Sequence, residues 1–203
     1  MYNVLIREPE QECRNVAIMM PGRGQPSVDM MARYDRYAEL DNTLLLAVAP
    51  MEEWYPAPRG ANNQMEAVWG LKLSVPEFND FIEKIEQEYQ FPQSKVALVG
   101  FSAGSVMAIQ AAAWSDKPYA AVVAHNGAIL EPSDLPRARH DTPFLLLHNE
   151  NDDCFSWDER YLPMKIALID KRYNLEVIEN DVGGHYISPE DVGLAGDWLR
   201  RHL

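Results

Sequence analysis

The sequence is poor in cysteine, in positive charge and in long apolar runs, and each shortage excludes a class of protein. Cys13 and Cys154 are the only cysteines in 203 residues, which is too few for a disulfide framework or a cysteine-based metal site. Eighteen Lys and Arg against 31 Asp and Glu give a net charge of −13, which disfavours nucleic acid and anionic membranes as partners. No apolar run is long enough to span a bilayer.

The N-terminal stretch MYNVLIREPEQECRN lacks the basic segment and the long apolar core of a secretory signal. Together with the low cysteine content, this predicts a cytoplasmic protein. With 47% apolar residues, a chain of this length can bury one sizeable core. We therefore expect one domain over residues 1–203, with no linker or internal repeat.

Strand-like apolar runs alternate with amphipathic helical runs along the chain. Strands are expected over residues 2–6, 16–20, 43–49, 95–99, 120–125, 143–148 and 175–179, and helices over 28–40, 64–90, 157–173 and 188–203, besides one after Ser102. The first two strands are expected to pair with each other. A capping-box pattern around Pro76 predicts a break in the second helix. The alternation predicts an α/β fold, with a mostly parallel sheet of about seven strands and helices on both faces.

Polar and small residues follow the expected strands, at the edge where such sheets bind ligands. These segments are PGRGQ after Met20, PMEEWYP after Ala49, GFSAG after Val99, HNENDDC after Leu147 and NDVGGHYIS after Glu179. They bring a serine, acidic residues and a histidine to the ends of separate strands, in the chain order Ser, Asp, His.

The segment GFSAG places Ser102 between two glycines that permit a very sharp strand-to-helix turn. Alone, the pattern also fits an ordinary turn with a solvated serine. A serine that attacks an acyl carbon needs a base, the base needs a carboxylate, and the oxyanion needs backbone donors. Because candidates for all three follow the strands, the pattern predicts a nucleophile.

In this order the motifs resemble those of the phospholipase/carboxylesterase family of α/β-hydrolases, which includes small bacterial carboxylesterases and acyl-protein thioesterases. The likeness runs through MMPGRG, APMEEWYP, VALVGFSAG, LLLHNENDD and GGHYIS. It implies an α/β-hydrolase fold and no cofactor, with Ser102 as nucleophile, His185 as base, an Asp of residues 152–153 as the orienting acid, and the backbone N–H groups of Arg23 and Ala103 as oxyanion donors. The chain contains no long insertion that could form a cap domain.

Two residues compete for the role of the acid, because Asp152 and Asp153 are adjacent. The family spacing puts the acid four residues after His148, which selects Asp152. Asn149 stands where the family has glycine and could shift the turn by one residue, so Asp153 stays an alternative. Pro21 is a second departure, because it replaces the usual histidine and removes a backbone donor.

Residues 51–65 follow a strand and are rich in Pro, aromatic residues and Met. We expect a substrate pocket wall there, the alternative being ordinary core residues; its candidates are Met51, Trp54, Tyr55 and Met65. The acidic run NENDD lacks the ligand spacing of a calcium loop, so no metal is expected. Cys154 is expected to be buried and inert.

The sequence as a whole favours a serine hydrolase that cleaves carboxylic esters of small to medium acyl chain through an acyl-enzyme. One alternative is acyl-protein thioesterase or lysophospholipase-type activity on longer chains. The other is a non-catalytic ligand-binding protein on a hydrolase fold, which fold resemblance alone never excludes. The expected partner is a small-molecule ester, with no nucleic acid and no membrane span, and a homodimer remains a candidate assembly.

Overall fold

The computed structural model describes residues 1–10, 12–56 and 64–203. Its strands are β1 (Tyr2–Arg7), β2 (Asn15–Met20), β3 (Thr43–Pro50), β4 (Val96–Phe101), β5 (Ala121–His125), β6 (Pro143–Asn151) and β7 (Asn174–Gly183). Its α-helices are α1 (Ser27–Tyr37), α2 (Gln64–Tyr89), α3 (Ala103–Trp114), α4 (Leu162–Asp170) and α5 (Pro189–His202). Short 3₁₀ segments lie at Gln93–Lys95 and Pro132–Asp134, and a π-helical turn lies at Trp157–Tyr161.

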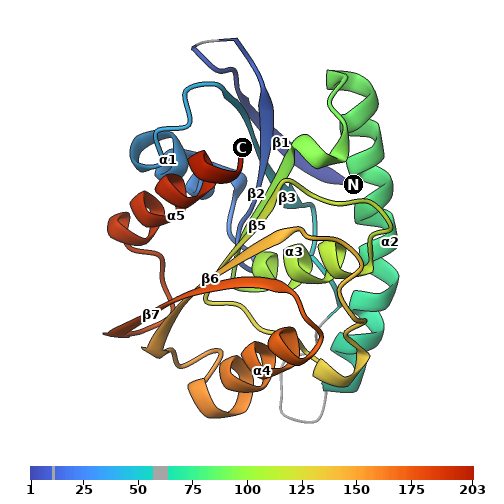
Figure 1. Ribbon diagram of the computed structural model, residues 1–203, viewed down its shortest axis with the longest axis vertical. Helices are drawn as coiled ribbons and strands as arrows, with labels where there is room; N and C mark the ends of the chain where they lie inside the picture. The colour runs from blue at the N-terminus through green and yellow to red at the C-terminus, as the bar shows by residue number, and fades with distance from the viewer. Residues whose placement is uncertain (11, 57–63) are drawn as a thin grey trace.

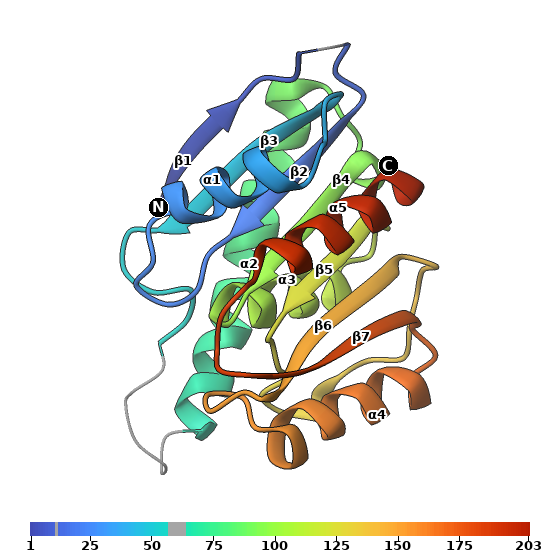
Figure 2. The same ribbon diagram turned by 90° about the vertical axis from the view of Figure 1, so that its left-hand side faces the viewer.

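The strands form one seven-stranded sheet in the order β1-β3-β2-β4-β5-β6-β7, as Figures 1 and 2 show. All neighbours are parallel except β1, which runs antiparallel to β3. The prediction that β1 and β2 pair with each other was wrong, because β3 lies between them. Every residue of β2 is buried, which a strand achieves with a neighbour on each side, whereas β1 is half-exposed and fits the edge.

Helices cover both faces of the sheet, as predicted. One apolar cluster joins the sheet to α1 and α5 through residues such as Tyr34 and Trp198. The other joins it to α2, α3 and α4 through residues such as Phe78, Met107 and Leu168. Figure 2 shows α1 and α5 side by side on the near face and the other three helices behind or below the sheet. The strands are therefore held between two apolar layers, which fixes the positions of their ends.

The predicted break at Pro76 was wrong, because α2 continues through this residue. A proline inside a helix lacks the N–H that would bond to the carbonyl four residues earlier. Here the loss is offset by burial on both sides of Pro76, where Leu71, Val75, Phe78 and Ile82 all pack into the core. Tertiary packing therefore outweighs the local signal.

Two other boundaries differ from the expectation. The expected helix over 157–173 is a π-helical turn followed by the short helix α4, and the last strand extends to Gly183. The expected start of α5 is confirmed, because the Ser188 hydroxyl accepts from the Asp191 N–H and Asp191 caps Ser188 in return. None of the helices in the described parts of the chain is long and apolar enough to pass through a membrane. The absence of a cap domain stays a prediction, since residues 57–63 lie outside the described residues.

Candidate active site

The turn between β4 and α3 holds Ser102 in a backbone conformation that side chains rarely adopt, with φ 54° and ψ −120°. The two glycines permit the turn. A Cβ on Gly100 would collide with the backbone of Ser105, and a Cβ on Gly104 would collide with the carbonyl of Met20. The Ser102 N–H donates to the His125 carbonyl of β5 at 3.0 Å, which ties the turn to the sheet. Ser102 is thereby presented at the carboxyl end of β4.

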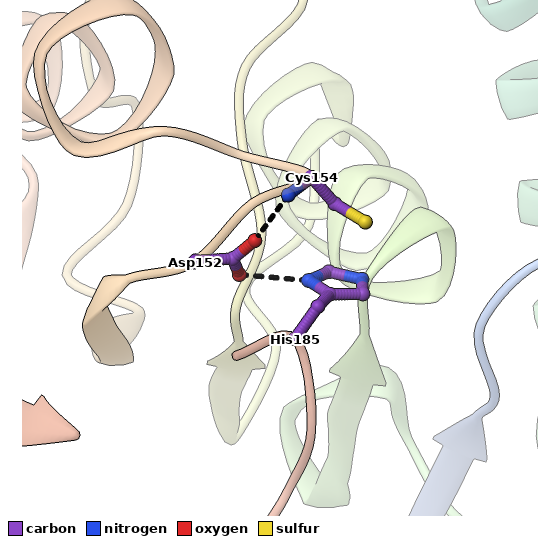
Figure 3. Close-up of side chains that lie close together, drawn as sticks. All are labelled: Asp152, Cys154 and His185. Carbon is purple, nitrogen blue, oxygen red and sulfur yellow. Dashed lines mark hydrogen bonds and ion pairs between the residues drawn. The ribbon is translucent and has the colours of Figure 1, made fainter. Parts of the chain in front are cut away.

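His185 lies in the loop between β7 and α5, and its ring connects Ser102 to Asp152. Its Nε2 is 2.7 Å from the Ser102 Oγ, and its Nδ1 is 2.7 Å from the Asp152 Oδ2. Figure 3 shows the second of these contacts, with the imidazole edge facing the carboxylate. The Phe101 ring lies 5.0 Å from the imidazole, between centroids, and covers one of its sides. Three residues that are far apart in the sequence thus form one chain of contacts.

Asp152 is the residue of the acidic pair that reaches His185. Its carboxylate is buried, and its Oδ1 accepts from the backbone N–H groups of Cys154 and Phe155 at 2.7 and 2.8 Å. Burial alone would raise its pKa, but the hydrogen bond from His185 and these two backbone donors outweigh burial and lower the pKa. The carboxylate is therefore ionised at neutral pH. Asp153 is exposed, whereas Asp152 contacts His185, so the geometry favours the register chosen from the sequence.

Two buried asparagines hold the loop that carries His185. The Asn149 side-chain amide, at the end of β6, donates to the carbonyls of Gly184 and Tyr186 at 2.9 and 3.3 Å, one on each side of His185. The Asn126 amide, after β5, donates to the Tyr186 carbonyl at 2.7 Å, and its Oδ1 accepts from the Asn149 N–H. We call Asn126 and Asn149 the asparagine clamp. Asn149 lies in β6 and Asn126 directly follows β5, so the clamp fixes the backbone around His185 relative to the sheet.

His125 is the last residue of β5 and bonds to the turn between β4 and α3 through its backbone. It is buried, and its Nε2 is 2.7 Å from the Tyr34 hydroxyl of α1. Its carbonyl accepts from both the Ser102 N–H and the Ser105 hydroxyl. Burial lowers the pKa of His125 to about 4, so this ring is neutral at physiological pH. Its position is that of a core histidine that supports the turn through its backbone.

A cavity of about 400 Å³ opens beside Ser102. It is lined by Gly22, Arg23, Gln25, Tyr55, Phe101, Ser102, Ala103, Cys154, Phe155 and His185. Both residues expected to supply oxyanion donors, Arg23 and Ala103, are therefore at the site. Of the four residues expected to form a pocket wall, the structure brings only Tyr55 to this cavity.

Trp54 is part of the core. It is 3% exposed, its indole N–H donates to the Pro21 carbonyl at 2.7 Å, and its ring packs edge-on against Phe78 of α2. Met51 and Met65 are exposed and do not line the described cavity. The expectation that these three residues contact substrate therefore has no support in the cavity geometry. Residues 57–63 of the same expected wall lie outside the described residues.

Asp152, Cys154 and His185 also offer ligand atoms of the kinds that bind metals, all within 4.8 Å of one another (Figure 3). The lone pairs of Asp152 and His185 are already engaged, because the carboxylate accepts three hydrogen bonds and both imidazole nitrogens have partners. A metal would have to break these contacts, so the arrangement suits proton transfer better than metal binding. The expectation that Cys154 is buried was wrong, since its side chain is exposed and lines the cavity.

The family model described as Phospholipase/Carboxylesterase matches residues 3–202. The chain belongs to this phospholipase/carboxylesterase family. It is a hydrolase with the α/β-hydrolase fold, so the resemblance drawn from the motifs and the predicted fold class are both confirmed.

Solved structures share the family fold over almost the full length of the chain. Esterase PE8 matches with a TM-score of 0.90 at 21% identity, over 100% of this chain and 99% of that one. The carboxylesterase of Bacillus cereus matches with a TM-score of 0.86 at 15% identity, over 100% of this chain and 95% of that one. A phospholipase/carboxylesterase of Dyadobacter fermentans matches with a TM-score of 0.79 at 18% identity, over 98% of this chain and 97% of that one. At these identities the likeness shows a common fold.

The asparagine clamp is the part of this family member's site that sequence analysis missed. Asn149 was noticed only as a departure from the family glycine, and Asn126 was not singled out. The available signal was an amide residue directly after each of two buried strands, since buried amides need partners and the nearest ones lie in the neighbouring loop.

Proposed function

We propose that this enzyme hydrolyses small-molecule carboxylic esters of small to medium acyl chain through an acyl-enzyme on Ser102. The observation that carries the proposal is the unbroken contact path from the Ser102 Oγ through the His185 ring to Asp152, with 2.7 Å at each step. Each group is of the type that its place in such a path requires.

The proton positions follow from which groups can donate. The Asp152 carboxylate is ionised and can only accept, so the His185 Nδ1 carries the proton and its Nε2 accepts from the Ser102 hydroxyl. This tautomer is the one in which Nε2 can act as a base. Once the imidazole takes up a second proton, the buried carboxylate stabilises its positive charge.

In the first half-reaction the Ser102 Oγ attacks the acyl carbon while the His185 Nε2 takes the hydroxyl proton. The tetrahedral intermediate then collapses, the ester C–O bond breaks, and the imidazolium returns this proton to the departing alcohol. In the second half-reaction the same nitrogen takes a proton from water, the hydroxide attacks the acyl-enzyme, and the acid is released as Ser102 regains its proton.

The negative charge on the intermediate needs donors near Ser102. Ala103 is the first residue of α3, and the first N–H groups of a helix have no partner within the helix. This N–H also stands at the positive end of the helix dipole, which favours an oxyanion there. We assign the second donor to the backbone N–H of Arg23, which borders the same cavity.

The cavity size supports an acyl group of short to medium length. A volume of about 400 Å³ lies at the lower end of the range for small-molecule sites. Tyr55 is buried and Phe155 half-buried, so their rings supply the firm apolar walls of this space. The solved structures of similar fold that are named as esterase or carboxylesterase agree with this reaction class.

The test is the hydrolysis of 4-nitrophenyl esters from acetate to palmitate by the wild-type chain and by Ser102→Ala. We expect the highest kcat/KM for acyl chains of about two to eight carbons, the lengths that a cavity of this size holds. A maximum at palmitate would instead support thioesterase or lysophospholipase-type activity on long chains. Binding without turnover of any ester would support the non-catalytic alternative.

A further inference from the structure

Resting on the proposed hydrolysis, we propose that the preferred ester carries a carboxylate group, which the side chain of Arg23 recognises. The inference concerns the substrate class, and it starts from the distribution of charge in the catalytic cavity.

The described lining of this cavity contains one permanent cation, Arg23, and no Asp or Glu. This composition is opposite to that of the whole chain, in which acidic residues outnumber Lys and Arg by 31 to 18. Asp152 lies behind His185 with its side chain fully buried, and its charge is engaged by three hydrogen bonds. The described residues that line the cavity therefore offer an anionic group one permanent positive charge, that of Arg23.

The guanidinium of Arg23 lies beside an aromatic ring of the cavity wall. Its guanidinium carbon lies 6.0 Å from the centroid of the Tyr55 ring, within the range of a cation–π contact. Tyr55 is 3% exposed, so the ring is a fixed support. Burial raises the pKa of the Tyr55 hydroxyl to about 12 despite the opposing effect of Arg23, so the ring stays neutral beside the cation.

The guanidinium suits a carboxylate by its geometry as well as by its charge. It presents its N–H donors in a planar fork and lies beside the Tyr55 ring of the cavity wall. A carboxylate accepts two of them in parallel, an arrangement that selects geometry as well as charge. The backbone N–H of Arg23 is the proposed oxyanion donor, and Arg23 and Ser102 line the same cavity. A carboxylate bound by the Arg23 side chain would therefore belong to a substrate whose ester group lies at Ser102.

Nearby acids limit the size of the effect. Glu53 also acts on the Tyr55 hydroxyl, and it lines a separate cavity together with Glu52 and Glu77. Arg23 is exposed, so water and salt screen its charge. We therefore expect a selectivity of about tenfold, the lower end of the range for hydrogen bonds to charged groups.

The experiment compares two pairs of esters that differ in one carboxylate. Monomethyl adipate and methyl hexanoate differ at the end of a six-carbon acyl chain, and 4-acetoxybenzoate and its methyl ester differ in the leaving group. The measured quantity is the ratio of kcat/KM for the charged ester to that for its neutral partner. Any general effect of a substitution on the catalytic machinery changes both rates and cancels in this ratio.

In at least one pair, the wild-type ratio is expected to favour the charged ester. Arg23→Gln should lower that ratio about tenfold, mainly through KM, and Arg23→Lys should retain part of it. The matched control is Arg36→Gln, because Arg36 also lies over a tyrosine ring, that of Tyr37, but does not line the cavity. This control should leave the ratio unchanged.

Two results would overturn the inference while leaving the hydrolase intact. In the first, the wild-type chain prefers the neutral ester in both pairs. In the second, the esters are hydrolysed but Arg23→Gln leaves the ratio of kcat/KM unchanged in both pairs. If none of the four esters is hydrolysed by the wild-type chain, the proposed function fails and the inference falls with it.

Discussion

Four segments lie at the carboxyl ends of parallel strands: the turns after β4, β6 and β7, and the segment after β3. The sequence predicts the positions of the side chains well in the three turns and poorly in the segment after β3. The three turns bring Ser102, Asp152 and His185 together as expected. The segment after β3 was expected to line the pocket, and there Tyr55 borders the cavity while Trp54 packs into the core.

The difference lies in how many constraints act on each residue. A nucleophile, its base and its acid must satisfy a chain of donors and acceptors, and few residue types in one order can do so. A large aromatic side chain can pack in a core or line a pocket, so its residue type does not tell these positions apart. Its direction is decided by neighbours such as Phe78, which lie far away in the sequence.

The largest effect expected in this comparison comes from the acidic pair. Asp152→Asn should lower kcat about 10⁴-fold with the fold intact, because the amide no longer fixes the imidazole tautomer. Asp153→Asn should change kcat less than about tenfold, since a surface substitution of this kind removes little. Steady-state kinetics on a short-chain ester decide the matter. A severe loss in Asp153→Asn with Asp152→Asn near normal would reverse the assignment.

The segment after β3 gives the next largest effect, on stability rather than on specificity. Trp54→Ala removes a buried ring and should lower the free energy of unfolding by roughly 3–5 kcal/mol, with the acyl-chain profile unchanged. Phe155→Ala should cost less stability, because Phe155 is only half-buried, and should alter the profile. Urea titrations and an ester panel measure both effects. A shifted profile in Trp54→Ala would place its ring at the substrate after all.

His125, whose carbonyl bonds to the turn that carries Ser102, predicts a pH dependence of stability. The pKa of His125 falls from 6.5 to about 4 on folding, so between these pH values the unfolded chain binds the extra proton. Stability should therefore fall by about 3 kcal/mol as the pH drops from 6.5 to 4, and His125→Gln should remove this contribution. Denaturant unfolding of both proteins across this range tests it. Parallel curves for the two proteins would show that His125 does not titrate this way.

The asparagine clamp gives the smallest of these effects. Asn149→Gly restores the family residue and removes the amide bonds to the carbonyls on both sides of His185. We expect kcat to fall roughly tenfold to 100-fold, because small displacements of a catalytic group cost rate, and KM to change little. Kinetics on a short-chain ester would contradict a positioning role if kcat stayed at the wild-type value or KM carried the change.

The fold, and the contact between Ser102, His185 and Asp152, could be predicted from the sequence because the alternation of strands and helices and the order Ser, Asp, His leave few arrangements. The place of β1 could not, since an edge strand and a strand that pairs with its sequence neighbour have the same local pattern. The uninterrupted path of α2 through Pro76 depends on packing of Val75 and Phe78 against the sheet. The clamp depends on contacts between segments about 35 to 60 residues apart.

The most direct test of the account is to trap the nucleophile with a fluorophosphonate and locate the adduct by peptide mass spectrometry. The account predicts a stable adduct on the Ser102 Oγ that is absent in Ser102→Ala. Ser105→Ala provides the matched control and should still be labelled, because the buried Ser105 hydroxyl donates to the His125 carbonyl. An adduct on Ser105 or Cys154, or labelling that persists in Ser102→Ala, would contradict the central claim that Ser102 is the nucleophile.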